Sequence, residues 1–241
     1  MMYLQYVLLL AVLAGAMIAS VVAKKLTVAA ALTGGVLGVL VFEGAGFTGI
    51  AMVAIFFLFG TVATGWKKGY KERAGLSAIE SSKRNAGQVM ANAGVAAICG
   101  LLSYFFQWYV PVLRLMMAAS LSSAMADTLS SELGNVYGRR FYNILTLQKD
   151  TRGLNGVVSL EGTAIGIVGS VVIALVYTIG FGFAWSTILI IIIAGTIGNL
   201  SDSLLGASLE RKQYLNNDAV NFFNTAIAAL TALVLYFIVT S

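Results

Sequence analysis

Residues 160–205 read LEGTAIGIVGSVVIALVYTIGFGFAWSTILIIIIAGTIGNLSDSLL. This stretch contains two apolar runs, at about 160–180 and 184–205, and each is close to the roughly 20 residues that a helix needs to cross a bilayer. Similar runs occur at about 3–23, 26–42, 45–65, 88–108, 111–133 and 217–239. The sequence therefore predicts an all-α, polytopic integral membrane helix bundle with about eight transmembrane helices, or seven to nine, because the second run is short and glycine-rich.

The composition supports a membrane protein and excludes several chemistries. Of the 241 residues, 59% are hydrophobic and 10% are charged, whereas a soluble domain has about 25% charged residues. An ordinary soluble enzyme and a disordered chain are therefore excluded. Histidine is absent and Cys99 is the single cysteine, so histidine catalysis, disulfides and thiolate metal sites are excluded. Any metal must be bound by oxygen, which favours Mg²⁺, Ca²⁺ or Mn²⁺.

The basic residues predict the orientation. Of the 15 basic residues, 14 lie in the segments 24–25, 67–84, 139–152 and 211–212, and Arg114 is the exception. Eight alternating spans would place these four segments on one side, which the positive-inside rule makes cytoplasmic, with the N-terminus outside. The first apolar run is too long for a signal peptide and lacks its basic region. We therefore expect a prokaryotic integral plasma membrane protein whose polar site faces the cytoplasm.

Three carboxylates lie within or beside the apolar runs. Asp127 and Glu132 belong to the fifth run and Asp202 to the seventh, and neither helix face carries a lysine or arginine to neutralise them. Because charge in a membrane is costly, such residues mark a functional site by default. The other polar residues near these span ends have simpler explanations, since glycines pack helices, asparagines cap them and hydroxyls bond to their own backbone.

This set of side chains suits phosphoryl transfer. Carboxylates and amides are ligands for Mg²⁺, and nearby basic residues such as Lys83 and Arg84 suit a phosphate-bearing substrate. The P-loop motif is missing, because Trp66 follows Gly65 where Gly-Lys-Ser/Thr would be required. The glycine-containing segment 152–159 either offers backbone N–H groups to phosphate at a helix start or forms a simple turn.

A short internal repeat predicts that two aspartates meet. Ala126-Asp127-Thr128-Leu129 and Ser201-Asp202-Ser203-Leu204 share an Asp-Ser/Thr-Leu core. Both segments lie at the same end of spans that run in the same direction. A parallel repeat about the membrane normal would therefore bring Asp127 and Asp202 face to face.

Five ordered motifs resemble the DUF92, or transmembrane protein 19, family over about residues 66–225. They are Arg84-Asn85-x-x-Gln88-Val89-x-Ala91-Asn92, Ala126-Asp127-Thr128-x-x-Ser131-Glu132-x-Gly134, Gly162-Thr163-x-x-Gly166-x-x-Gly169-Ser170, Asp202-Ser203-Leu204-Leu205-Gly206-Ala207 and Asn217-Asp218-x-Val220-Asn221. The resemblance implies a prenyl-phosphate kinase, since the plant member is the chloroplast phytyl-phosphate kinase, which uses CTP or another nucleoside triphosphate. The chain departs from the family in a less complete glycine signature at 153–157 and in Glu210, where glutamine is expected.

The resulting hypothesis is a Mg²⁺-dependent polyprenyl (phytyl or geranylgeranyl) monophosphate kinase that uses a nucleoside triphosphate. CTP is the favoured nucleotide. Residues 1–65 would be accessory helices and residues 66–241 the family core. We expect the lipid bilayer, a prenyl-phosphate lipid and a nucleotide as partners, and no nucleic acid. Asp127, Glu132 and Asp202 would bind the metal and be catalytic. The expected nucleotide or phosphate ligands are Lys83, Arg84, Asn85, Arg152, Asn155, Gly156 and Thr163. The expected substrate-orienting residues are Gln88, Asn92, Thr128, Ser131, Asn199, Ser203, Asp218 and Asn221.

Two alternatives remain open at this stage. One is a CTP-dependent prenol kinase or a lipid cytidylyltransferase, which product analysis would distinguish. The other is a cation or small-solute transporter, because carboxylates beside close-packed glycine helices also occur in ion pathways. Transporter sites tend to lie near the bilayer midplane, whereas these polar residues cluster at one face, which favours the enzyme.

Overall fold

The computed structural model describes residues 2–76 and 83–240 and confirms an all-α membrane bundle. Within these residues, seven helices are long and apolar enough to cross a membrane. They are α1 (Met2–Val22), α2 (Val28–Gly65), α4 (Ala86–Phe105), α5 (Val110–Tyr137), α6 (Leu160–Phe181), α7 (Trp185–Leu205) and α8 (Asn217–Thr240). The shorter elements are α3 (Lys68–Arg73), the 3₁₀ turn η1 (Gln107–Tyr109), the π-helical turn η2 (Gly206–Glu210) and the antiparallel strands β1 (Tyr142–Asn143) and β2 (Val157–Val158).

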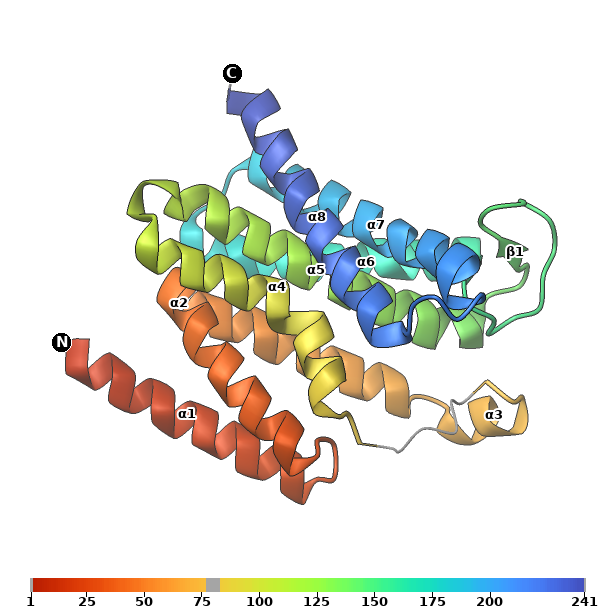
Figure 1. Ribbon diagram of the computed structural model, residues 1–241, viewed down its shortest axis with the longest axis horizontal. Coiled ribbons are helices and arrows are strands. Elements are labelled where there is room, and N and C mark those ends of the chain that lie inside the picture. Colours follow the sequence, from red (N-terminus) through yellow and green to blue (C-terminus); the bar gives the residue numbers. More distant parts are fainter. Residues whose placement is uncertain (1, 77–82, 241) are drawn as a thin grey trace.

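Helix α2 doubles back on itself and supplies both the second and the third predicted spans. The reversal is at Gly46, whose φ of 57° and ψ of −149° interrupt the helix and are accessible mainly to glycine. Beyond it, Phe57 packs against the cluster of Ala30 and Ala31 in the first turn of α2 and Leu26 just before it. The two arms therefore lie side by side, as Figure 1 shows. The predicted runs 26–42 and 45–65 correspond to these arms.

Helix α5 is the centre of the bundle. It packs against α2, α4, α6, α7 and α8, and its side chains Leu115, Met117, Leu121 and Met125 are almost completely buried. Neighbouring helices approach it closely because glycines lie at the contacts. A β-carbon on Gly195 would lie 2.1 Å from the hydroxyl of Ser122. Small residues at helix crossings are how membrane helices gain close packing.

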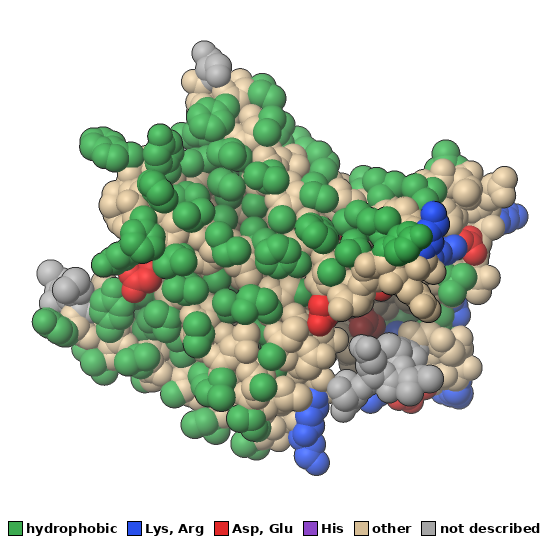
Figure 2. Space-filling view, in the orientation of Figure 1, with side chains coloured by type: hydrophobic (Ala, Val, Ile, Leu, Met, Phe, Trp, Pro, Cys, Tyr) green, Lys and Arg blue, Asp and Glu red, His purple; other side chains and the backbone are tan. Residues whose placement is uncertain are grey.

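The charged residues lie mainly at one end of the bundle, which we call the polar end. Hydrophobic side chains cover most of the face in Figure 2, while most of the basic side chains gather where α3 and the β1–β2 hairpin lie. Backbone bonds join Arg84 to Lys25, Arg152 donates to Tyr70, and Arg211 pairs with Asp150. These contacts bring the four basic segments together, as predicted. That this end faces the cytoplasm stays a prediction.

The contact between α4 and the first arm of α2 provides a test of the packing. A β-carbon on Gly100 would lie 2.0 Å from the backbone oxygen of Leu40, so Gly100→Ala must push the helices apart. Overpacking of this kind costs about 1–3 kcal/mol, and we expect a lower unfolding temperature in detergent. Gly15→Ala is the matched control, because nothing lies within 4 Å of its β-carbon position. Equal unfolding temperatures for the two variants would contradict this packing.

Candidate functional site

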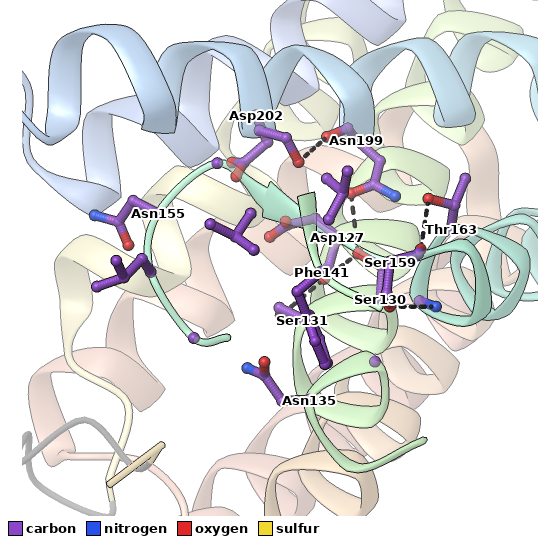
Figure 3. Close-up of a pocket in the computed structure, with 18 of the residues that line it drawn as sticks. Asp127, Ser130, Ser131, Asn135, Phe141, Asn155, Ser159, Thr163, Asn199 and Asp202 are labelled. Atoms are coloured by element: carbon purple, nitrogen blue, oxygen red, sulfur yellow. Dashed lines mark hydrogen bonds between the residues drawn. The ribbon is translucent and has the colours of Figure 1, made fainter. Parts of the chain in front are cut away.

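A polar cleft opens at the polar end, between α5, α6, α7 and the loop that carries β1 and β2. It encloses about 170 Å³, and Figure 3 shows its wall. The described residues that line it are Asp127, Ser130, Ser131, Gly134, Asn135, Phe141, Gly153, Leu154, Asn155, Gly156, Val157, Val158, Ser159, Gly162, Thr163, Asn199, Leu200, Asp202, Ser203, Glu210 and Asn217. Most are polar or glycine, so the cleft suits a hydrophilic ligand at the end of a membrane bundle.

Two aspartates face each other in this cleft. Asp127 comes from α5 and Asp202 from α7 (Figure 3), and their carboxyl groups lie within hydrogen-bonding reach of each other. The predicted face-to-face arrangement is therefore confirmed. Glu210 also lines the cleft, and none of the described lining residues is a lysine or arginine. Both aspartates are half-buried, and like charges this close repel each other, so a cation or a proton between the carboxyl groups would relieve the repulsion.

The π-helical turn η2 directs Glu210 toward the cleft. Asp202 and Glu210 are eight residues apart, and in an α-helix that separation would rotate them about 80° away from a common face. The wider turn at Gly206–Glu210 reduces this rotation, and the Glu210 carboxylate reaches the side chain of Asn155. Sequence reasoning missed Glu210 as a cleft residue, since its one signal was the departure from the family pattern. Such π turns often occur at functional sites.

The loop 150–156 is fixed against the end of α7. Gly156 has a φ of +72°, and a β-carbon there would lie 2.3 Å from that of Ala207. The Arg211 Nε donates to the carbonyl oxygen of Asn155 at 2.6 Å, and its Nη2 donates to Asp150 Oδ2 at 2.9 Å. The loop therefore holds the Asn155 and Gly156 backbone at the cleft wall.

Asp150 is kept ionised by the groups around it. The Thr151 backbone N–H, the Asn143 amide and the Arg211 guanidinium all donate to its carboxylate, and together they hold the pKa of Asp150 below its ordinary value. The pair with Arg211 is therefore fully present at neutral pH. It is lost only when acid protonates Asp150 below the usual carboxyl range.

The first turn of α6 forms another wall of the cleft. Ser159 caps the helix by accepting the Gly162 N–H at 3.1 Å, while Thr163 donates to the Ser159 carbonyl. Gly162 lies against Gly134 of α5. A β-carbon on Gly134 would come within 2.8 Å of the Gly162 Cα. Ser159 therefore occupies the Gly162 and Thr163 N–H groups of this turn, and the cap fixes this wall beside the cleft.

Glu132 is directed away from the cleft. Lys71, which is 4% exposed, donates to Glu132 Oε2 at 2.5 Å. The same ammonium also donates to the carbonyl oxygens of Ala63 and Thr64 at the end of α2. The ion pair therefore joins α3, α2 and α5.

Arg84 and Arg152 also lie outside the cleft lining. The Arg84 guanidinium lies over the rings of Phe56 and Phe57. Burial lowers the pKa of Arg84, and attraction from Glu132 opposes the shift. Arg152 lies over the rings of Tyr70 and Phe141, and Phe141 lines the cleft. Arg152 thus lies at the rim, whereas Arg84 packs α4 against α2.

The structure separates the candidate residues into two groups. The cleft brings together Asp127, Ser131, Asn155, Gly156, Thr163, Asn199, Asp202 and Ser203, and leaves Lys83, Arg84, Asn85, Gln88, Asn92, Thr128, Glu132, Arg152, Asp218 and Asn221 outside its described lining. Asn85 and Gln88 form a capping box at the start of α4, and Asn92 donates to the Gln88 carbonyl. The cleft also contains Ser130, Asn135, Phe141 and Glu210, which were not among the candidates.

The glycine loop provides a test of the cleft wall. Gly156→Ala combines an unfavourable positive φ with a clash against Ala207, so we expect the loop to detach and tryptic cleavage after Arg152 to accelerate. Gly182→Ala is the control, because Gly182 also has a positive φ, of +96°, but has nothing within 4 Å of its β-carbon position. The same cleavage rate in both variants would show that the Ala207 contact does not hold the loop.

Comparisons with known proteins agree with this architecture. The model of the family described as integral membrane protein DUF92 matches residues 10–229. The chain is 31% identical over 205 residues to the chloroplastic protein VTE6 of Arabidopsis thaliana, covering 83% of this chain and 62% of that protein's length. It is 34% identical over 202 residues to an uncharacterized membrane protein of Synechocystis, covering 82% of this chain and 78% of the relative.

An uncharacterized membrane protein of the archaeon Methanocaldococcus jannaschii is 28% identical over 211 residues, which cover 83% of this chain and 82% of the relative. No solved structure is a significant match. With the family model matching most of its length, the chain belongs to the DUF92 family of integral membrane proteins.

Proposed function

We propose that this protein is a Mg²⁺-dependent kinase that converts a prenyl monophosphate, such as phytyl or geranylgeranyl phosphate, to the diphosphate. The phosphoryl donor would be a nucleoside triphosphate, with CTP as the favoured candidate. The observation that carries the proposal is the pair Asp127 and Asp202 in a cleft whose described lining has no basic side chain. The family resemblance supplies the reaction class. Membership of an integral membrane protein family supports a substrate with a lipid part.

The residues of the cleft fit Mg²⁺. Asp127 and Asp202 supply carboxylate oxygens, and Asn199 and Ser203 supply further oxygen donors beside them. Among the described residues, no three Asp, Glu, His or Cys side chains form a complete ligand group. Mg²⁺ is typically held by one or two carboxylates together with water and substrate phosphates. When bound by the two aspartates, the ion would neutralise charge that builds up on the transferring phosphoryl group.

The protein's own groups would position the two phosphates. Backbone N–H groups along Asn155–Gly156 would hold oxygens of the triphosphate, and the Thr163 hydroxyl also lies at the cleft. In the reaction, an oxygen of the prenyl phosphate attacks the γ-phosphorus. The bond from that phosphorus to the bridging oxygen breaks, and the nucleoside diphosphate leaves.

The basic residues would act around the cleft rather than in it. Arg152 lies over Phe141 at the rim, and the chain has a net charge of +5, so the field of the basic residues at the polar end would attract a polyphosphate. Glu132 with Lys71 would fix the C-terminal part of α5 that carries Ser131. The prenyl chain would stay in the apolar phase beside the bundle, with the site on the cytoplasmic face of the plasma membrane, where nucleotides are available.

The aspartates provide the decisive mutational test. Asp127→Asn or Asp202→Asn should reduce transfer of label from γ-labelled CTP or ATP to geranylgeranyl monophosphate by at least about 100-fold, because each change removes charge that would hold the cation. Glu43→Gln is the matched control, since Glu43 accepts from Tyr6 outside the cleft. Each variant should elute as a single folded species. Full activity in both aspartate variants would refute the assignment.

The products of the same assay distinguish the other reactions. Label that appears only with geranylgeraniol as acceptor would identify a prenol kinase. Release of pyrophosphate with a cytidyl group on the lipid would identify a cytidylyltransferase. No transfer and no nucleotide binding by intact protein would favour a cation or solute transporter.

A further inference from the structure

A buried asparagine supports Asp202 from behind the cleft. Asn224 of α8 is 0% exposed, and its Nδ2 donates to Asp202 Oδ2 at 2.7 Å. The Ser123 hydroxyl of α5 donates to Asn224 Oδ1 at 2.9 Å. The chain of hydrogen bonds Ser123–Asn224–Asp202 therefore joins three helices beneath the cleft.

This chain of bonds fixes which way the amide points. Because a serine hydroxyl donates to the amide oxygen, the amide nitrogen is left to face the carboxylate. Gly198 of α7 makes room for the arrangement, since a β-carbon there would lie 2.2 Å from the Ser123 hydroxyl and 2.8 Å from the Asn224 carbonyl oxygen. One oxygen of Asp202 is thus occupied from the side of α8, and the carboxylate is held toward Asp127.

We propose that Asn224 is a positioning residue that orients Asp202 for a divalent cation shared with Asp127. The inference rests on the cation site of the proposed function. Asn224 is not among the described residues that line the cleft, so it acts through Asp202 rather than by touching substrate. Groups that hydrogen-bond a metal-binding carboxylate typically change metal affinity 10- to 100-fold when they are removed.

The test measures binding of Mn²⁺ alone to the purified full chain by electron paramagnetic resonance, without nucleotide. Asn224→Leu keeps a similar volume and removes the amide, and we expect the Kd for Mn²⁺ to rise about 10- to 100-fold. Ser123→Ala removes the group that orients the amide, and a smaller rise in the same direction is expected. Asp202→Asn should abolish this binding.

Thr225→Val is the matched control on the same helix. Thr225 is equally buried, but its hydroxyl donates to the carbonyl oxygens of Phe222 and Ala91 rather than to Asp202. Its Kd for Mn²⁺ should equal that of the unmodified protein. An equal weakening in Thr225→Val and Asn224→Leu would indicate general loosening of α8 and would overturn the proposal.

The remaining outcomes separate this inference from the proposed function. An unchanged Kd in Asn224→Leu, with binding lost in Asp202→Asn, overturns the role of Asn224 and leaves the kinase proposal standing. If Asn224→Leu does not fold, an unchanged Kd in Ser123→Ala overturns it instead. No binding of Mn²⁺ to the unmodified protein overturns both this inference and the cation site.

Discussion

The close approach of α6 and α7 to α5 is the constraint on which the cleft depends. Glycines at 134, 162, 195 and 198 let the backbones meet where side chains would otherwise hold them apart. Without water in the bilayer core, such contacts supply much of the association between helices. The same contacts bring an aspartate of α5 within hydrogen-bonding reach of one from α7. Packing and chemistry are therefore determined by one set of small residues.

The described lining of the cleft has three acidic side chains, Asp127, Asp202 and Glu210, and no lysine or arginine. In the proposed function, a cation held by the two aspartates and the Asn155–Gly156 backbone would contact phosphate in place of lysine and arginine. The basic residues have defined structural contacts instead. Arg211 holds the loop at Asn155, and Lys71 caps the end of α2. Basic residues of the polar end thus also hold the cleft loop and the end of α2 in place.

Much of the fold follows from apolar run length, and part of the site follows from helical periodicity. The predicted helices and the facing aspartates were both confirmed. Periodicity identifies which residues share a helix face but does not show which helices meet. The pairing of Glu132 with Lys71, 61 residues apart, requires the reversal of α2. The position of Glu210 requires a π turn that no local composition predicts, and the packing of Arg84 on two rings requires tertiary contacts.

The second arm of the α2 hairpin contacts two cations that follow it in the chain, Lys71 and Arg84. It provides the rings beneath Arg84 and the carbonyl oxygens that receive Lys71. Separated from this arm, the remaining helices would leave the Lys71 ammonium without these carbonyl oxygens and Arg84 without its rings. Removing one side of a buried charge contact costs more than the contact itself contributes. Exchange of this arm between relatives would therefore succeed only when the cations at positions 71 and 84 move with it.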